Sequence, residues 1–211
     1  MDDLFNSVLA EYTQRSEAEE HIWETEDSAT LFQRRDEFLL HIGEHPARFL
    51  HALAVANEAK MLVEIGTSYG YSTLFLADAA RKTGGKLITF EISAEKQNYA
   101  KEKLEKANLA EYVDWQLGDA VSLLKELKNS VDFVLIDIWK DLYIPCFELL
   151  YPKLNPGAII AADNMLEPKM HREDAEKYRA AIKKKRDLQT LLLPIGSGIE
   201  LSCLIPQQLP Q

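Results

Sequence analysis

Acidic side chains stand at the ends of two expected strands of this 211-residue chain. Asp137 closes the apolar segment 131–137, and Asp163, followed by Asn164, closes the segment 157–163. Neighbouring parallel strands end at the same edge of a sheet, so we expect these side chains to converge there. Carboxylate and amide oxygens suit Mg²⁺. The sequence therefore predicts a divalent cation site formed by Asp137, Asp163 and Asn164.

A lysine lies three residues beyond the first of these aspartates. Lys140 is close enough to Asp137 to face the same site, where a nearby divalent cation would favour the neutral amine and make it a competent base. Without a cation, the two carboxylates would repel each other. The alternative interpretation is that the aspartates cap helices and that the lysine lies on the surface.

A loop with two glycines follows the first expected strand, residues 61–65. Gly66 and Gly70 allow the backbone to approach a ligand, and the start of the next helix favours an anionic group near Ser72. The glycines are four residues apart, so the dinucleotide pattern G-x-G-x-x-G is not met, which favours a carboxylate over a pyrophosphate. Glu91 ends the second expected strand, where it could accept two hydrogen bonds from a ribose diol. The alternative is an ordinary turn beside a solvated glutamate.

The third expected strand, residues 112–117, ends in Gly118-Asp119-Ala120. This sequence is also common in turns. Together with the glycine loop and Glu91, it indicates a further part of the same crevice.

Residues 41–45 read His-Ile-Gly-Glu-His, which matches a metalloprotease pattern that needs both histidines on one helical face. Gly43 and Pro46 disfavour such a helix, so we expect a loop over the crevice instead of a zinc site. His51 has no evident partner in the sequence. The basic run at 183–186 is expected to be a solvated helix end, where positive charge complements the helix dipole.

Alternating β-rich and helical segments must position these residues. Strands are expected at 61–65, 86–91, 112–117, 131–137 and 157–163, with helices at 71–81, 94–108, 120–127 and 142–150. This order predicts an α/β fold with a doubly wound, mostly parallel sheet. After a charged helix at 171–186, apolar segments at 188–193 and 199–205 are separated by only five residues, which predicts an antiparallel C-terminal hairpin.

Helical segments precede the sheet. Apolar residues from Leu4 to Tyr12 recur at helical spacing, a second helix is expected at 28–40, and a third begins with Pro46 in its first turn. We expect one domain over residues 1–211, with a helical cap at 1–57 and an α/β core at 58–205.

Composition narrows the function classes. The net charge is −10 and 46% of the residues are apolar. An acidic surface repels nucleic acid and acidic lipids, so we expect neither a nucleic acid nor a membrane partner. The two cysteines lack the spacing of a zinc site, the N-terminus does not resemble a signal peptide, and the apolar runs are far shorter than the ~18 residues of a membrane helix. A soluble cytoplasmic protein is expected.

These motifs resemble the cation-dependent S-adenosylmethionine O-methyltransferases, the family of catechol O-methyltransferase and the caffeoyl-CoA type enzymes. The likeness runs from the Ile42-Gly43 loop to Glu200 and is most specific at Asp137-x-Trp139-Lys140-Asp141-x-Tyr143. It implies a Rossmann-like methyltransferase fold, with S-adenosylmethionine and Mg²⁺ or another divalent cation as cofactors.

The resemblance also implies residue roles. Lys140 would take the phenol proton, the cation would be held by the three residues named above, and Glu200 would face the second hydroxyl of the acceptor. The implied cofactor-binding residues are Ile42, Glu64, Gly66, Ser72, Glu91, Asp119, Ala120 and Asp137. The chain departs from the animal catechol enzyme at Phe38, Pro46 and Ile138, where that enzyme has tryptophan, lysine and histidine.

The expected reaction is methyl transfer to one hydroxyl of a vicinal diphenol chelated to Mg²⁺. The partner is then a small phenolic substrate whose identity and site of methylation the sequence leaves open. Both a monomer and a homodimer are compatible with it. Two alternatives remain: a metal-independent methyltransferase acting on another small acceptor, and a nonenzymatic S-adenosylmethionine-binding protein. A nicotinamide dehydrogenase is disfavoured by the glycine spacing and the terminal hairpin.

Overall fold

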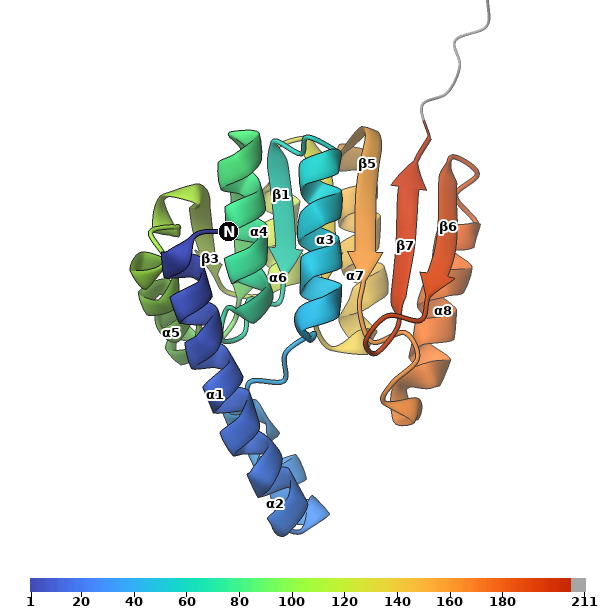
Figure 1. Ribbon diagram of the computed structural model, residues 1–211. Helices are drawn as coiled ribbons and strands as arrows, with labels where there is room; N and C mark the ends of the chain where they lie inside the picture. Colours follow the sequence, from blue (N-terminus) through green and yellow to red (C-terminus); the bar gives the residue numbers. More distant parts are fainter. Residues whose placement is uncertain (206–211) are drawn as a thin grey trace, which may run out of the picture.

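The computed structural model describes residues 1–205, except for the side chains of residues 28, 29 and 32. A seven-stranded sheet lies between two layers of helices (Figure 1). The strand order is β3-β2-β1-β4-β5-β7-β6, and β7 runs antiparallel to both of its neighbours. The predicted fold class is therefore confirmed. The strands are β1 (Met61–Ile65), β2 (Lys86–Glu91), β3 (Val113–Leu117), β4 (Val131–Ile136), β5 (Leu154–Ala162), β6 (Leu188–Leu193) and β7 (Ile199–Leu204).

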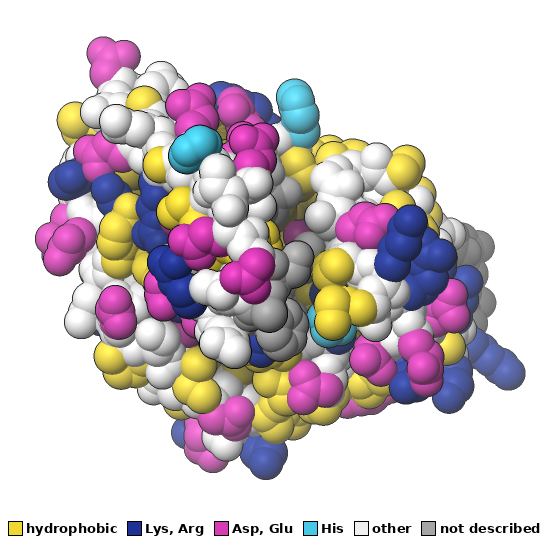
Figure 2. Space-filling model, turned by 90° about the horizontal axis from the view of Figure 1, so that it is seen from below, with side chains coloured by type: hydrophobic (Ala, Val, Ile, Leu, Met, Phe, Trp, Pro, Cys, Tyr) yellow, Lys and Arg dark blue, Asp and Glu magenta, His cyan; other side chains and the backbone are white. Residues whose placement is uncertain are grey.

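The strand order changes direction at β1, which pairs in parallel with both β2 and β4. In open α/β sheets, ligands bind beyond the carboxyl ends of the strands at such a switch point. Ile65 pairs with Ile136, so the residues that follow, Gly66 and Asp137, leave the sheet side by side. Figure 2 looks onto this edge, where acidic, basic and apolar side chains are mixed over the surface.

Each helical layer encloses its own core. On one face lie α1 (Asp3–Thr25), α3 (Glu44–Ala56), α4 (Tyr71–Thr83) and α5 (Ala94–Lys106), and on the other α6 (Ala120–Glu126), α7 (Tyr143–Leu150) and α8 (Arg172–Lys183). Phe133 and Val134, adjacent in β4, belong to opposite cores. Successive side chains of a strand point to opposite faces, so a central strand covered on both sides is apolar throughout. The short helices are η1 (Arg35–Glu37), η2 (Ala110–Tyr112), η3 (Lys140–Leu142), η4 (Tyr151–Lys153) and η5 (Lys169–His171).

The N-terminal helices differ from the prediction. α1 continues well beyond the apolar stretch that predicted it, and its later part extends with α2 (Ser28–Arg34) past the sheet edge (Figure 1). The helix expected at 28–40 ends earlier, and η1 follows α2. Two local features prevent a helix from continuing after η1 to residue 40: the Leu39 N–H donates to the Glu19 carboxylate at 2.7 Å, and Leu40 has a φ of +41°. This backbone cannot continue an α-helix.

α3 begins at Glu44 with Pro46 in its first turn, as predicted. His51 in this helix does have a partner, because its Nε2 lies 2.8 Å from a carboxylate oxygen of the buried Asp78 in α4. The sequence missed this contact because 27 residues separate the two. Within residues 1–205, no helix combines the length and apolar character needed to cross a bilayer.

Candidate functional site

The loop after β1 packs tightly against the residue that follows β4. Gly66 has a φ of +102°, and a Cβ atom at this position would lie 1.9 Å from the carbonyl oxygen of Asp137. The Asp137 N–H donates to the Ile65 carbonyl at 2.9 Å. Only glycine fits this arrangement, and the structure therefore places the predicted cofactor loop beside the predicted cation site.

Glu64, predicted at the cofactor, is fully buried in β1. Its carboxylate accepts hydrogen bonds of 2.6 Å from the hydroxyls of Ser72, Thr73 and Thr89. Burial raises the pKa of Glu64 to about 7, although these three hydrogen bonds act to lower it. Ser72 and Thr73 lie in the first turn of α4, so the carboxylate holds the start of this helix against β1. The structure thus brings Glu64 and Ser72 together.

Glu91 lies at the end of β2, next to the glycine loop. One carboxylate oxygen accepts from the Ser68 N–H at 2.7 Å, and the other accepts from the N–H groups of Ile92 and Ser93 at 2.9 Å. A carboxylate offers about four acceptor positions, so these three bonds leave room for a further donor. The side chain is half-buried and can still reach a ligand.

The turn after β3 lies at the same edge. The Gly118 N–H donates to the Glu91 carbonyl at 2.8 Å. Asp119 caps α6 by accepting from the Ser122 N–H at 2.8 Å, and Ala120 is buried. The predicted turn is thus beside Glu91, while helix capping accounts for the Asp119 carboxylate.

Asp163 directly follows β5 and is only 1% exposed. Among the described residues, 1–205, its two carboxylate oxygens are buried without a hydrogen-bond partner. Its N–H donates to the Ile136 carbonyl at 3.1 Å, which places it beside Asp137. Burial, and then the charge of Asp137, raise the pKa of Asp163 above its usual range, and burial also raises that of Asp137. A desolvated carboxylate without a hydrogen-bond donor, next to a second acidic residue, fits a bound cation.

A cation at this position would need a third ligand. No group of three or more His, Cys, Asp or Glu side chains in residues 1–205 is arranged to hold a metal ion. The predicted set has two carboxylates, and Asn164 would supply an amide oxygen. Asn164 follows Asp163 directly, with a left-handed φ of +55°. Hard oxygen donors of this kind match Mg²⁺, which keeps several water molecules in its coordination shell.

Lys140 in η3 is buried and faces Asp163. Its Nζ donates to the Tyr143 hydroxyl at 2.6 Å and to the Asp163 backbone carbonyl at 3.0 Å. Burial lowers the pKa of Lys140 to about 8, against the opposing effects of Asp137 and Asp163. An amine with this pKa can accept a proton near neutral pH. Sequence reasoning assigned no role to Tyr143, and its contact with Lys140 becomes visible only in the structure.

The His-Ile-Gly-Glu-His segment does not form a helical metal pair. His41 lies in the loop before α3, where its Nε2 is 2.8 Å from the Ser16 hydroxyl and its ring stacks on Tyr71. Ile42 is buried, and its carbonyl oxygen would be 3.3 Å from a Cβ at Gly196, so the loop packs against the β6–β7 link. The expected loop is therefore confirmed for residues 41–43, whereas Glu44 and His45 begin α3, and its place over the crevice stays a prediction.

The structure also places two further positions that were named with the resemblance. Glu200 is buried toward α8, where its carboxylate accepts from Arg179 at 2.7 Å and from Thr190 at 2.6 Å. The alternation of β7 directs this side chain to the α8 face of the sheet, and its role toward an acceptor hydroxyl stays a prediction. Phe38, one of the departures from the animal catechol enzyme, is only 3% exposed and packs against Trp23.

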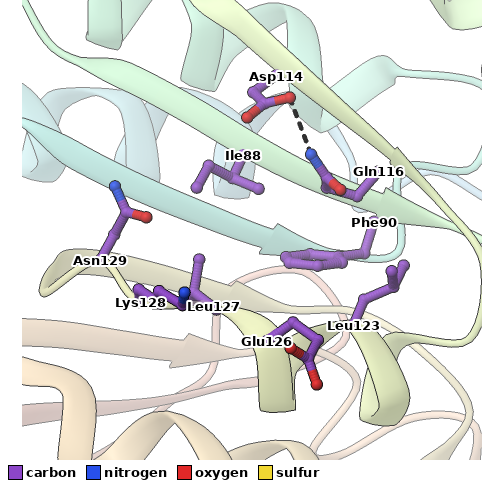
Figure 3. Close-up of a pocket in the computed structure, with 9 residues that line it drawn as sticks. All are labelled: Ile88, Phe90, Asp114, Gln116, Leu123, Glu126, Leu127, Lys128 and Asn129. Carbon is purple, nitrogen blue, oxygen red and sulfur yellow. Dashed lines mark hydrogen bonds between the residues drawn. The ribbon is translucent and has the colours of Figure 1, made fainter.

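A cavity of about 270 Å³ lies away from these residues, between β2, β3 and α6 (Figure 3). Apolar side chains of Ile88, Phe90 and Leu123 face it, and Gln116 donates to Asp114 at its edge. It contains none of the predicted site residues. The candidate site therefore lies at the strand ends and not at this cavity.

Comparison with known proteins agrees with this geometry. A family model described as O-methyltransferase matches residues 14–205. The catechol O-methyltransferase of Niastella koreensis is 31% identical over 131 residues, 60% of this chain and 59% of that enzyme, so the chain spans less than two thirds of its length. Caffeoyl-CoA O-methyltransferase 2 of Eucalyptus globulus is 30% identical over 184 residues, 77% of this chain and 74% of that one.

The fold is also found in solved structures. The O-methyltransferase from Bacillus cereus in complex with SAH matches with a TM-score of 0.78 at 24% identity, over 97% of this chain and 92% of that chain. This likeness concerns the fold, whereas the family model covers nearly all of the sequence. On that match, the chain belongs to the O-methyltransferase family.

Proposed function

We propose that this protein transfers the methyl group of S-adenosylmethionine to one hydroxyl of a vicinal diphenol, with the help of a divalent cation such as Mg²⁺. The observation that carries the proposal is the buried Asp163, whose carboxylate oxygens have no hydrogen-bond partner within residues 1–205 and which lies beside Asp137 and Lys140. The names of the catechol and caffeoyl-CoA relatives support a phenolic acceptor. The SAH in the Bacillus cereus structure supports the cofactor.

The cofactor would lie across the switch point of the sheet. Glu91 has acceptor capacity left for a ribose hydroxyl. The methionine part would be bordered by Ile42, Glu64 and Ser72, and Glu64 already accepts a hydrogen bond from the Ser72 hydroxyl. The remaining proposed contacts come from Gly66, Asp119, Ala120 and Asp137.

The cation would be held by Asp137, Asp163 and Asn164. When bound, it would lower the pKa of the phenol and fix its orientation. The neutral amine of Lys140 accepts the phenol proton and becomes an ammonium group. The phenolate oxygen then forms a bond to the methyl carbon while the carbon–sulfur bond breaks, and its electron pair stays on sulfur to give S-adenosylhomocysteine.

Positioning supplies most of the rate in this scheme. Aligned reactants gain ~7 to 11 kcal/mol, whereas one well-placed base contributes about 10² to 10⁴ in rate. Loss of the cation is therefore expected to be more damaging than loss of Lys140, because the cation site orients the acceptor.

The test is methylation of catechols, caffeate esters and flavonoids with labelled S-adenosylmethionine, with and without Mg²⁺. We expect turnover of at least one diphenol, its loss in EDTA, and its loss in Asp137→Asn while cofactor binding stays measurable. Full turnover in EDTA would support the metal-independent alternative. Tight S-adenosylhomocysteine binding without turnover of any acceptor would instead support the nonenzymatic one.

A further inference from the structure

We propose that Tyr143 is a positioning residue for the reaction. Its hydroxyl, together with the backbone carbonyl of Asp163, fixes the direction in which the Lys140 amine faces the acceptor. This inference rests on the proposed role of Lys140 as the base, and it adds a residue to which neither the sequence motif nor the proposed mechanism assigns a function.

Three polar atoms form a closed, buried triangle. The Lys140 Nζ lies 2.6 Å from the Tyr143 hydroxyl and 3.0 Å from the Asp163 carbonyl oxygen, and the Tyr143 hydroxyl lies 3.1 Å from that carbonyl. The amine donates to both oxygens, and the hydroxyl donates to the carbonyl. Tyr143 is fully buried and Lys140 is 8% exposed, so bulk water does not compete freely for these bonds.

The two hydrogen bonds of the Lys140 amine fix the orientation of the one position on its nitrogen that is left. An amine nitrogen has four tetrahedral positions, of which one is bonded to Cε and two carry the hydrogens donated to Tyr143 and Asp163. One position remains. It holds a lone pair before proton transfer and a proton afterwards, so it points the same way in both states. With the hydroxyl removed, a single hydrogen bond would hold the nitrogen, which could then rotate about the last bond of the side chain.

The hydroxyl itself is placed by the core. Tyr143 is the first residue of α7, and its ring packs against the Tyr178 ring of α8 with centroids 5.4 Å apart. Burial holds the pKa of Tyr143 well above its usual value, so it remains a hydroxyl donor at neutral pH. The side chain is therefore in place before any substrate binds, which is the property required of a positioning group.

Tyr178 offers a matched control. Its hydroxyl is also buried and, within the described part of the chain, has no hydrogen-bond partner. Tyr143→Phe and Tyr178→Phe thus remove the same atom from two rings in contact, but only the first removes a bond to Lys140. Both keep the ring packing, and their thermal unfolding midpoints test whether the folds match.

The experiment measures kcat and KM for both variants with catechol and with 4-nitrocatechol, whose more acidic phenol needs less help from a base. For Tyr143→Phe we expect kcat with catechol to fall about 10-fold or more, a smaller fall with 4-nitrocatechol, and an unchanged KM for S-adenosylmethionine. Tyr178→Phe should behave like the native protein. In a Lys140→Met background, Tyr143→Phe should cause no further loss.

Several results would overturn the proposal: native kcat in Tyr143→Phe, equal losses with both acceptors, or the full loss persisting in the Lys140→Met background. If the native protein methylates no diphenol, the proposed function fails, and the crystal structure of Tyr143→Phe then decides this inference separately. Displacement of the Lys140 amine from the Asp163 carbonyl would support a positioning role. A Lys140 amine that keeps its native position in Tyr143→Phe would contradict the positioning role.

Discussion

The hydroxyl of Tyr12 donates a 2.6 Å hydrogen bond to the backbone carbonyl of Tyr69, so helix α1 is joined directly to the loop that follows β1. The bond is buried and spans 57 positions of the sequence. A Cβ at the neighbouring Gly70 would lie 3.0 Å from the same hydroxyl oxygen. The helical cap therefore contributes to the shape of the proposed cofactor loop as well as covering the sheet.

Tyr12→Phe should weaken cofactor binding without unfolding the protein. The substitution leaves the Tyr69 carbonyl buried without this donor, at a net cost of ~0.5 to 1.5 kcal/mol. If the loop relaxes to recover a partner, the dissociation constant of S-adenosylhomocysteine should rise about 2- to 12-fold at 25 °C. Isothermal titration calorimetry measures this dissociation constant.

The control is Tyr151→Phe, which removes a 2.6 Å bond to Asp187 away from the loop and should leave the dissociation constant unchanged. An unchanged constant for Tyr12→Phe as well would mean that the loop does not depend on α1.

Gly66→Ala should abolish cofactor binding. A methyl group at this position would overlap the Asp137 carbonyl, which lies 1.9 Å from the required Cβ, and the backbone would have to move. Gly157→Ala is the matched control, because Gly157 also has a positive φ, +83°, but nothing lies within 4 Å of its added Cβ. The control should lose ~1 kcal/mol of stability from backbone strain and keep its affinity. Thermal unfolding and calorimetry on both variants separate strain from steric overlap; equal affinities would contradict the packing of Gly66 against Asp137.

Regular local patterns made much of the fold predictable. β1, β2 and β6 have the expected bounds because each is a short apolar run set off by turns or helices. β5 begins at Leu154 instead of 157, since a register shift opposite 131–133 of β4 lets the strand include Pro156 and Gly157. The sequence predicts that this strand starts at Gly157. A bulge depends on the partner strand, so the residues of one strand alone do not reveal it.

The sequence predicts which residue types lie at the strand ends of the site, but it does not predict which of their side chains contact one another. The meeting of Asp137 with Asp163 follows from the rule that parallel strands end together. The Thr73 and Thr89 bonds to Glu64, and the Tyr143 bond to Lys140, depend on side-chain directions that no spacing encodes. The contact of Glu200 with Arg179 was missed for the same reason.

Asp78 should be among the most sensitive positions for stability. Its side chain is fully buried. Burial acts to raise its pKa, but hydrogen bonds from His51 and Arg81 outweigh that effect and hold the pKa well below the ordinary 3.8. Removing the Asp78 charge leaves the charge of Arg81 without this partner. Asp78→Asn should therefore lower the free energy of unfolding, measured in urea at pH 7, by on the order of 3 kcal/mol. Asp174→Asn, on the exposed side of α8, should change little.

The pH dependence of this cost has a definite sign. Because the folded pKa of Asp78 is depressed, its contribution is complete above the unfolded value near 3.8 and is lost as the pH falls below it. The difference in unfolding free energy between the native protein and Asp78→Asn should therefore shrink as the pH falls below about 4. A difference that stays constant from pH 7 to pH 3 would show that the carboxylate is not held in its charged form by these partners.

Asp163→Asn should stabilise the protein in EDTA and remove its response to Mg²⁺. The pKa of Asp163 is raised by burial and by Asp137, so without metal the carboxylate costs stability as the pH rises above its unfolded value of 3.8. In EDTA, the unfolding midpoint of the native protein should fall relative to that of the variant between pH 5 and pH 8. A saturating cation should reverse the order of the two unfolding midpoints, since a cation at 100 times its dissociation constant adds about 2.7 kcal/mol of stability.

The control is Asp141→Asn, at an exposed aspartate in the same segment, because it accounts for the general effect of removing one negative charge. Parallel pH responses for the native protein and Asp163→Asn would mean that Asp137 and Asp163 do not share a desolvated site, and the reason for placing a cation between them would be lost.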